Sequence, residues 1–238
     1  MRTKIVALAL AAGATTAMAD TVQLRSLGLV SGASGTARVT SLAGMKSNSL
    51  VGAGQIKHSI NGTKDLFTFC TELGQTTSGA FHTFNCVDEL ADAPVPGAGM
   101  GTVKADAIGR MYSFASSSLG AGNMFDKLSA GIQGDTDNFA AAFQLAIWEV
   151  VEDYNAGDTF DASSDDPFIG FGGTFQVNDF STSGTTDASD VQNIFATLLG
   201  VAADTTLASE TRLGALTSES RQDQIILVPL PGSAGLAA

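Results

Sequence analysis

Hydrophobic and polar residues alternate along the chain up to about Leu90, in short segments separated by turn-forming residues. Alternation with a period of two is typical of strands that bury one face. We predict strands at TVQLRSLGLV, TARVTSLAG, QIKHSI, DLFTFCTEL and FHTFNCVDEL, with turns at SGASG, NSLVGAG, NGTK and TTSGA. Cys70 and Cys86 therefore belong to consecutive strands.

From Gly101 onward, apolar residues recur at intervals of three and four, which is the helical period. The prolines of the preceding loop ADAPVPGAGM rule out a continued strand there. We predict helices from Gly101, over 138–154 with Asp137 as N-cap, and over 188–202, followed or interrupted by short strands at FIGFGGTFQV and QIILVPL. This order predicts an α+β fold: an antiparallel β-sandwich or barrel with a helical insertion and a C-terminal strand.

Residues 1–19 have the pattern of a secretory signal peptide. Arg2 and Lys4 form a basic start, an apolar run follows, and Ala17-Met18-Ala19 is a small-x-small cleavage site. We expect cleavage before Asp20, one domain over 20–231 and a small-residue tail over 232–238. The protein is therefore expected to be exported, to the extracellular space or the cell surface.

Charge and composition exclude several classes of function. The chain has 24 acidic against 12 basic residues, a net charge of −12, and no cluster of Lys and Arg, which excludes nucleic acid as a partner. No stretch after the signal peptide reaches the roughly 20 apolar residues of a membrane span. His58 and His82 are the only histidines, and neither fits a metal or triad pattern. We therefore expect no enzyme activity, no metal and no cofactor.

Gln144 lies on the apolar face of the predicted helix 138–154. At about 100° per residue it falls between Val151 and Trp148, whereas Glu149 lies on the polar face. A buried amide without partners costs roughly 1–3 kcal/mol. We therefore expect a partner for Gln144, of which a carbonyl group of a neighbouring strand is the simplest.

The two cysteines have more than one possible state. If TTSGA turns a hairpin near Ser78, Cys70 and Cys86 face each other across the strand pair. Exported chains with two cysteines usually oxidise them, and such a disulfide stabilises the fold by about 3 kcal/mol. A Cys70–Cys86 disulfide and free thiols both remain open on this reasoning.

Three segments of the chain resemble the thioester domains of bacterial surface proteins and a related group of exported proteins with PEP-CTERM sorting tails. They are FTFCTELGQ, ADAPVPGAGMGTVKADAIGRMYSFA and AAFQLAIWEVVED, within about residues 39–154. In thioester domains, an aromatic-Cys motif on a strand and a TQxA-[IV]-W motif on a helix supply an internal bond between the Cys sulfur and the Gln side-chain carbonyl. The resemblance implies Cys70 and Gln144 as the bonded pair.

The same resemblance implies supporting positions and shows two departures. Gln75 matches an intervening Gln of the family, and Trp148 matches the Trp of the helical motif. Phe143 stands where the family has Thr, which removes a hydroxyl group beside the amide. Cys86 offers Cys70 a competing partner.

The C-terminal segment QIILVPLPGSAGLAA contains Val-Pro-Leu-Pro at 228–231, which is similar to the Val-Pro-x-Pro signature that opens PEP-CTERM tails. In that family a membrane helix and a basic cluster follow, whereas seven residues follow Pro231 here and none is basic. We expect either a truncated sorting signal or a final strand stopped by prolines.

Two functions follow from these patterns. The first is an exported cell-surface or extracellular-matrix protein with a binding or structural role toward a surface protein or polysaccharide. The alternative is a covalent adhesin, in which a Cys70–Gln144 thioester reacts with an amine of the partner.

Overall fold

The computed structural model describes residues 21–41, 46–120, 123–129, 136–160, 170–180 and 187–228. Within these ranges the chain has an α+β fold, with a seven-stranded antiparallel sheet and four α-helices. The predicted signal peptide over 1–19, the tail over 232–238 and the proline-containing part of the Val-Pro-Leu-Pro motif lie outside the described residues.

Six of the seven strands close into a barrel. The strands are β1 (Thr21–Ser41), β2 (Lys46–Ile60), β3 (Lys64–Cys70), β4 (His82–Val87), β5 (Gln176–Asp179), β6 (Leu213–Thr217) and β7 (Gln224–Leu227). Their order is β2-β3-β7-β6-β4-β1-β5, and β1 also pairs with β2, which closes the ring. Each ring strand contributes an apolar side chain to one cluster inside it: Leu24, Ile60, Leu66, Phe84, Leu216 and Ile226. This arrangement confirms the barrel alternative of the sequence prediction.

The first two strands are longer than predicted, because both predicted turns SGASG and NSLVGAG lie inside them. The β1–β2 register shifts between Leu29 and Ser34, which marks a bulge. Opposite Ser34 lies Gly54, whose φ is +149°, and a Cβ atom there would stand 2.5 Å from the Ser34 Cα atom. Glycine is therefore needed for close approach of the two strands at this point, not for a turn.

The predicted turn at NGTK is confirmed and joins β2 to β3. Ile60 pairs with Lys64, so three residues form the connection. Asn61 and Gly62 have positive φ, 50° and 76°, and the N–H of Thr63 donates to the Ile60 carbonyl at 3.0 Å, which closes the turn. The predicted hairpin around Ser78 is wrong. TTSGA connects β3 to β4, but these strands are not neighbours, because β7 and β6 lie between them in the sheet.

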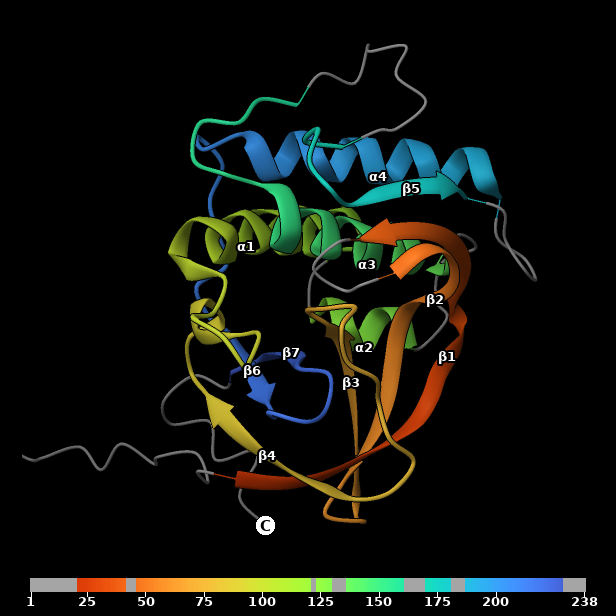
Figure 1. Cartoon of the computed structure of the whole chain (residues 1–238), viewed down its shortest axis with the longest axis vertical. Helices are drawn as coiled ribbons and strands as arrows, with labels where there is room; N and C mark the ends of the chain where they lie inside the picture. The colour runs from red at the N-terminus through yellow and green to blue at the C-terminus, as the bar shows by residue number, and fades with distance from the viewer. Residues whose placement is uncertain are drawn as a thin grey trace, which may run out of the picture.

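The helices are α1 (Gly101–Ser118), α2 (Met124–Ser129), α3 (Thr136–Asp153) and α4 (Ala188–Ala203), with a short 3-10 helix η1 (Leu90–Asp92). The predictions of α1, α3 and α4 are confirmed, and α2 was not predicted. Asp137 does not cap α3: it lies in the first turn, and its Oδ1 atom accepts the N–H of Ser34 at 2.9 Å. In Figure 1, α1, α3 and α4 lie together at one end of the barrel, where β3 ends.

The predicted polar face of α3 is covered by the chain that follows it. Glu149 is fully buried and accepts the N–H of Phe171. Asp153 accepts the N–H groups of Thr174 at 2.9 Å and Phe175 at 2.7 Å. Every residue of α3 from 140 to 150 is thus buried, while residues 137, 139 and 151–153 are half-buried. No helix of the described segments is long and apolar enough to cross a membrane.

Candidate functional site

Cys70 and Gln144 are in direct contact. The Oε1 atom of Gln144 accepts the backbone N–H of Cys70 at 2.9 Å and lies 3.3 Å from the Cys70 sulfur. The Nε2 atom of Gln144 donates to the Cys70 carbonyl at 2.8 Å. Gln144 is 0% exposed and Cys70 4%. The expectation that a carbonyl group of a neighbouring strand meets the Gln144 amide is therefore confirmed.

Two aromatic neighbours hold the strand and the helix in this register. Cys70 is the last residue of β3, where it pairs with Gln224 of β7. Its neighbour Phe69 points to the helical side and meets the ring of Phe143 edge-on, with 5.1 Å between ring centroids. Phe143 stands where thioester domains have Thr, so this position contributes packing instead of a hydroxyl group. The ring contact therefore fixes the position of Gln144 on α3 relative to Cys70 on β3.

Burial keeps the Cys70 side chain in its thiol form. Removal from water raises the pKa of the thiol well above its ordinary value, and the negative charge of Glu72 raises it further. A thiolate is therefore disfavoured at this site. Any reaction of the sulfur has to be coupled to movement of its proton.

Two acidic residues lie near Cys70: Glu72, which is half-buried, and Asp223, which is fully buried. Burial raises the pKa of Glu72 to about 8, although Thr71 donates its hydroxyl to the carboxylate and Asp223 donates its N–H at 2.8 Å. Burial also raises the pKa of Asp223 to about 6. The carboxylate accepts the N–H groups of Ser218 at 2.6 Å and Val95 at 2.7 Å, and these hydrogen bonds lower the pKa in part. The two carboxyl groups thus join the end of β3 to the loops before β7 and before α1.

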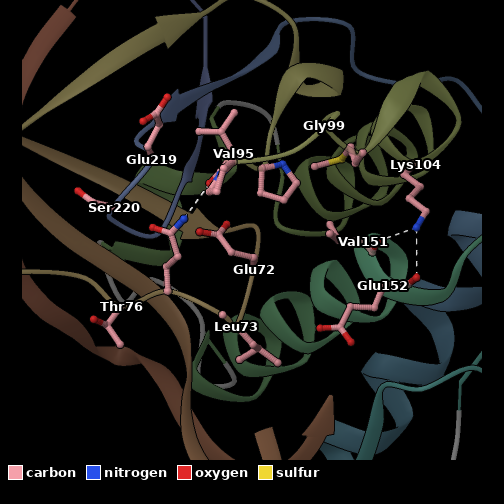
Figure 2. Close-up of a pocket in the computed structure, with 15 residues that line it drawn as sticks. Glu72, Leu73, Thr76, Val95, Gly99, Lys104, Val151, Glu152, Glu219 and Ser220 are labelled. Carbon is pink, nitrogen blue, oxygen red and sulfur yellow. Dashed lines mark hydrogen bonds between the residues drawn. The ribbon is translucent and has the colours of Figure 1, made fainter. Parts of the chain in front are cut away.

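A cavity of about 820 Å³ opens beside the pair (Figure 2). Residues 72–76, 94–96, 99–100, 104, 151–152 and 219–220 line it. Lys104 points to the end of α3 and donates to the carbonyl groups of Val151 at 2.6 Å and Glu152 at 3.2 Å, and burial lowers its pKa. Neither Cys70 nor Gln144 lines the cavity. The lining residue nearest to Cys70 in the sequence is Glu72, two residues after it.

Neither supporting candidate forms a side-chain hydrogen bond with Cys70 or Gln144. Gln75 lies at the cavity, where its Nε2 atom donates to the Val95 carbonyl at 2.8 Å. Trp148 lies one turn beyond Gln144 on α3 and is 2% exposed. Its indole N–H has no acceptor within the described parts of the chain.

The structure does not bring Cys70 and Cys86 together, so the predicted Cys70–Cys86 disulfide is wrong. Cys86 pairs with Leu216 of β6, and Leu216 pairs with Gln224, the partner of Cys70. Strands β3 and β4 therefore stand on opposite sides of the ring, with two strands between them in either direction. That places them about 10 Å apart or more, whereas a disulfide requires Cα atoms within about 7 Å.

Sequence reasoning missed the acidic groups at the site. Glu72 carries a weak signal, since it shares the strand face of Cys70 in the alternating pattern. Asp223 and Lys104 carry none, because their positions depend on how distant loops assemble. The described residues include no cluster of His, Cys, Asp and Glu that would hold a metal ion.

Comparison with known proteins gave no relative: no protein-family model, no curated protein and no solved structure matches the chain significantly.

Proposed function

We propose that the protein is an exported surface protein that attaches covalently to its partner through an internal thioester between Cys70 and Gln144. One observation carries the proposal: the thiol lies 3.3 Å from the Gln144 carbonyl oxygen while the Cys70 N–H donates to that same oxygen at 2.9 Å. The resemblance of the two motifs to thioester domains supports the same pair.

The contact brings the sulfur next to the amide group that it would attack. The new bond joins Cys70 Sγ to Gln144 Cδ, and ammonia leaves with the thiol proton on its nitrogen. Negative charge develops on Gln144 Oε1 during the attack, and the Cys70 N–H already points at that atom. The donor that stabilises the charge is thus in position before the reaction.

Burial supports storage of such a bond. Both side chains are shielded from solvent, so water has little access to the carbonyl carbon. A partner amine that reaches it forms an amide with Gln144 and releases Cys70 as a thiol.

A second candidate function is a non-covalent binding or structural role toward a surface protein or polysaccharide. The observation in its favour is the bond from Gln144 Nε2 to the Cys70 carbonyl at 2.8 Å, which satisfies a buried amide without any reaction. The 820 Å³ cavity offers a binding site that does not need the cysteine.

Methylamine separates the two functions. Under the covalent proposal, the folded mature protein takes up one methylamine and the number of titratable thiols rises by one. Gln144→Ala removes the acyl group and abolishes the uptake. A folded native protein that takes up no methylamine contradicts the covalent proposal and favours the non-covalent one.

A further inference from the structure

Glu72 lines the cavity and is close to Cys70 along the chain. It follows Cys70 by two residues, and Figure 2 shows its carboxyl group among the side chains that line the cavity. Its negative charge acts on the Cys70 thiol. Neither member of the pair lines the cavity, whereas Glu72 does, so an amine held in the cavity can contact Glu72.

The charges around Glu72 favour an ammonium group in the cavity. Glu152 at the end of α3 and Glu219 in the turn before β7 also line it, and Asp223 donates its N–H to Glu72. Lys104 is the cation that faces this group, and it is bound to the carbonyl groups at the end of α3. Besides Glu72, two carboxyl groups, of Glu152 and Glu219, line the cavity with the one lysine, Lys104, which favours a cationic amine there.

Resting on the proposed thioester, we propose that Glu72 is the general acid–base residue of its aminolysis. The carboxylate takes a proton from an incoming ammonium, and the neutral amine attacks the Gln144 carbonyl carbon. As the bond between that carbon and Cys70 Sγ breaks, Glu72 gives its proton to the sulfur. It then takes a second proton from the nitrogen and releases it to solvent. One thioester and one ammonium thus become one amide, one thiol and one proton.

The local chemistry fits this role. Burial raises the pKa of Glu72 to about 8, which lets the group both accept and donate a proton near neutral pH. The sulfur needs a proton on leaving, because burial raises the pKa of the Cys70 thiol. The histidines are engaged elsewhere: His58 hydrogen-bonds to Gln224 and His82 to Ser78.

The test is the rate of methylamine uptake by the mature protein, followed by intact mass across pH. We compare native protein with Glu72→Gln, Glu72→Asp and Glu149→Gln. Glu149 is the matched control, since burial also raises its pKa to about 8, but it bonds to Phe171 and does not line the cavity. We expect Glu72→Gln to slow uptake about 100-fold or more, Glu72→Asp to retain part of the rate, and Glu149→Gln to leave it nearly unchanged.

The pH profile tests the proton transfer without any variant. In native protein at fixed total methylamine, the rate should rise and begin to level off at about pH 8, because half of Glu72 is ionised there and ionisation completes above it. In Glu72→Gln the rate should follow neutral methylamine and keep rising about tenfold per pH unit. A native rate that keeps rising in this way past pH 8, or a Glu72→Gln rate equal to the native one, overturns the role of Glu72 and leaves the thioester standing. A native protein that takes up no methylamine overturns both.

Discussion

Cys70 and Cys86 lie on opposite sides of one barrel, and their surroundings differ. At Cys70 the strand ends against α3, and both the backbone and the thiol contact the Gln144 amide. Cys86 lies in β4, where it pairs with Leu216 and packs against the apolar cluster inside the barrel with Phe84. The first cysteine faces a carbonyl group, and the second faces hydrocarbon.

The comparison teaches that strand pattern alone does not decide what a cysteine can do. Both residues stand in short alternating strands with aromatic neighbours. The difference comes from what covers the strand: a helix with one inward amide in the first case, the opposite barrel wall in the second. Cys70 is therefore the reactive candidate and Cys86 a packing residue.

The largest expected effect is on reactivity and compares the two cysteines directly. Cys70→Ala should abolish methylamine uptake, because the nucleophile of the internal bond is gone, whereas Cys86→Ala should take up methylamine like native protein. Intact mass after incubation measures both. Loss of uptake in Cys86→Ala with a native fold would contradict the assignment of the reaction to the β3 side.

The next effect compares one phenylalanine from each region. Phe69 packs between Phe125 and Phe143 on the helical side, and Phe84 packs inside the barrel. Either change to Ala should lower the free energy of unfolding by about 3–5 kcal/mol, measured by urea denaturation.

The two variants should differ in chemistry although they match in stability. Phe69→Ala loosens the register of Cys70 against Gln144 and should slow methylamine uptake, while Phe84→Ala should not. Equal uptake in the two folded variants would mean that the ring contact does not position the pair.

On the helical side, stability should fall as pH rises. Burial raises the pKa of Glu149 from its usual value of 4.5 to about 8, so the stabilisation from its protonated form is complete below about pH 4.5 and is lost as pH rises through 8. The melting temperature should therefore decrease by several degrees between pH 6 and pH 9. Glu149→Gln should flatten this decrease, and an unchanged slope in that variant would assign the effect to other groups.

Inside the barrel, the dependence of stability on pH should have the opposite sign and be smaller. Burial lowers the pKa of His58 to about 4, so its neutral form stabilises the fold above about pH 6.5 and this contribution is lost as pH falls through 4. His58→Gln keeps a donor toward Gln224 and should reduce the loss of stability in acid. Thermal scans between pH 7 and pH 4 measure it. A steeper acid loss in the variant would contradict the prediction.

The helical half of the site was predictable, because the helical period needs only local sequence. The spacing around Phe143 and Trp148 gave α3 its apolar face and turned Gln144 inward. The alternation around Phe69 likewise gave β3. Both halves of the pair were thus visible as separate elements.

The sheet order was not predictable from the same patterns. Strands β6 and β7 have five and four residues, and they insert between β3 and β4 from the far end of the chain. The sequence spacing predicted that the two cysteine strands form a hairpin. This prediction failed because no local signal reveals that two later strands insert between them. The hydrogen bond from the Asp223 N–H to Glu72 also depends on this insertion, since Asp223 precedes β7.

The most direct test of the central claim is the intact mass of the mature protein, freshly purified without amines. The account predicts a mass one ammonia below that of the unmodified chain, restored neither by reductant nor by Cys86→Ala, and absent in Cys70→Ala and Gln144→Ala. A folded native protein at the full unmodified mass, with both thiols titratable after unfolding, would contradict the thioester.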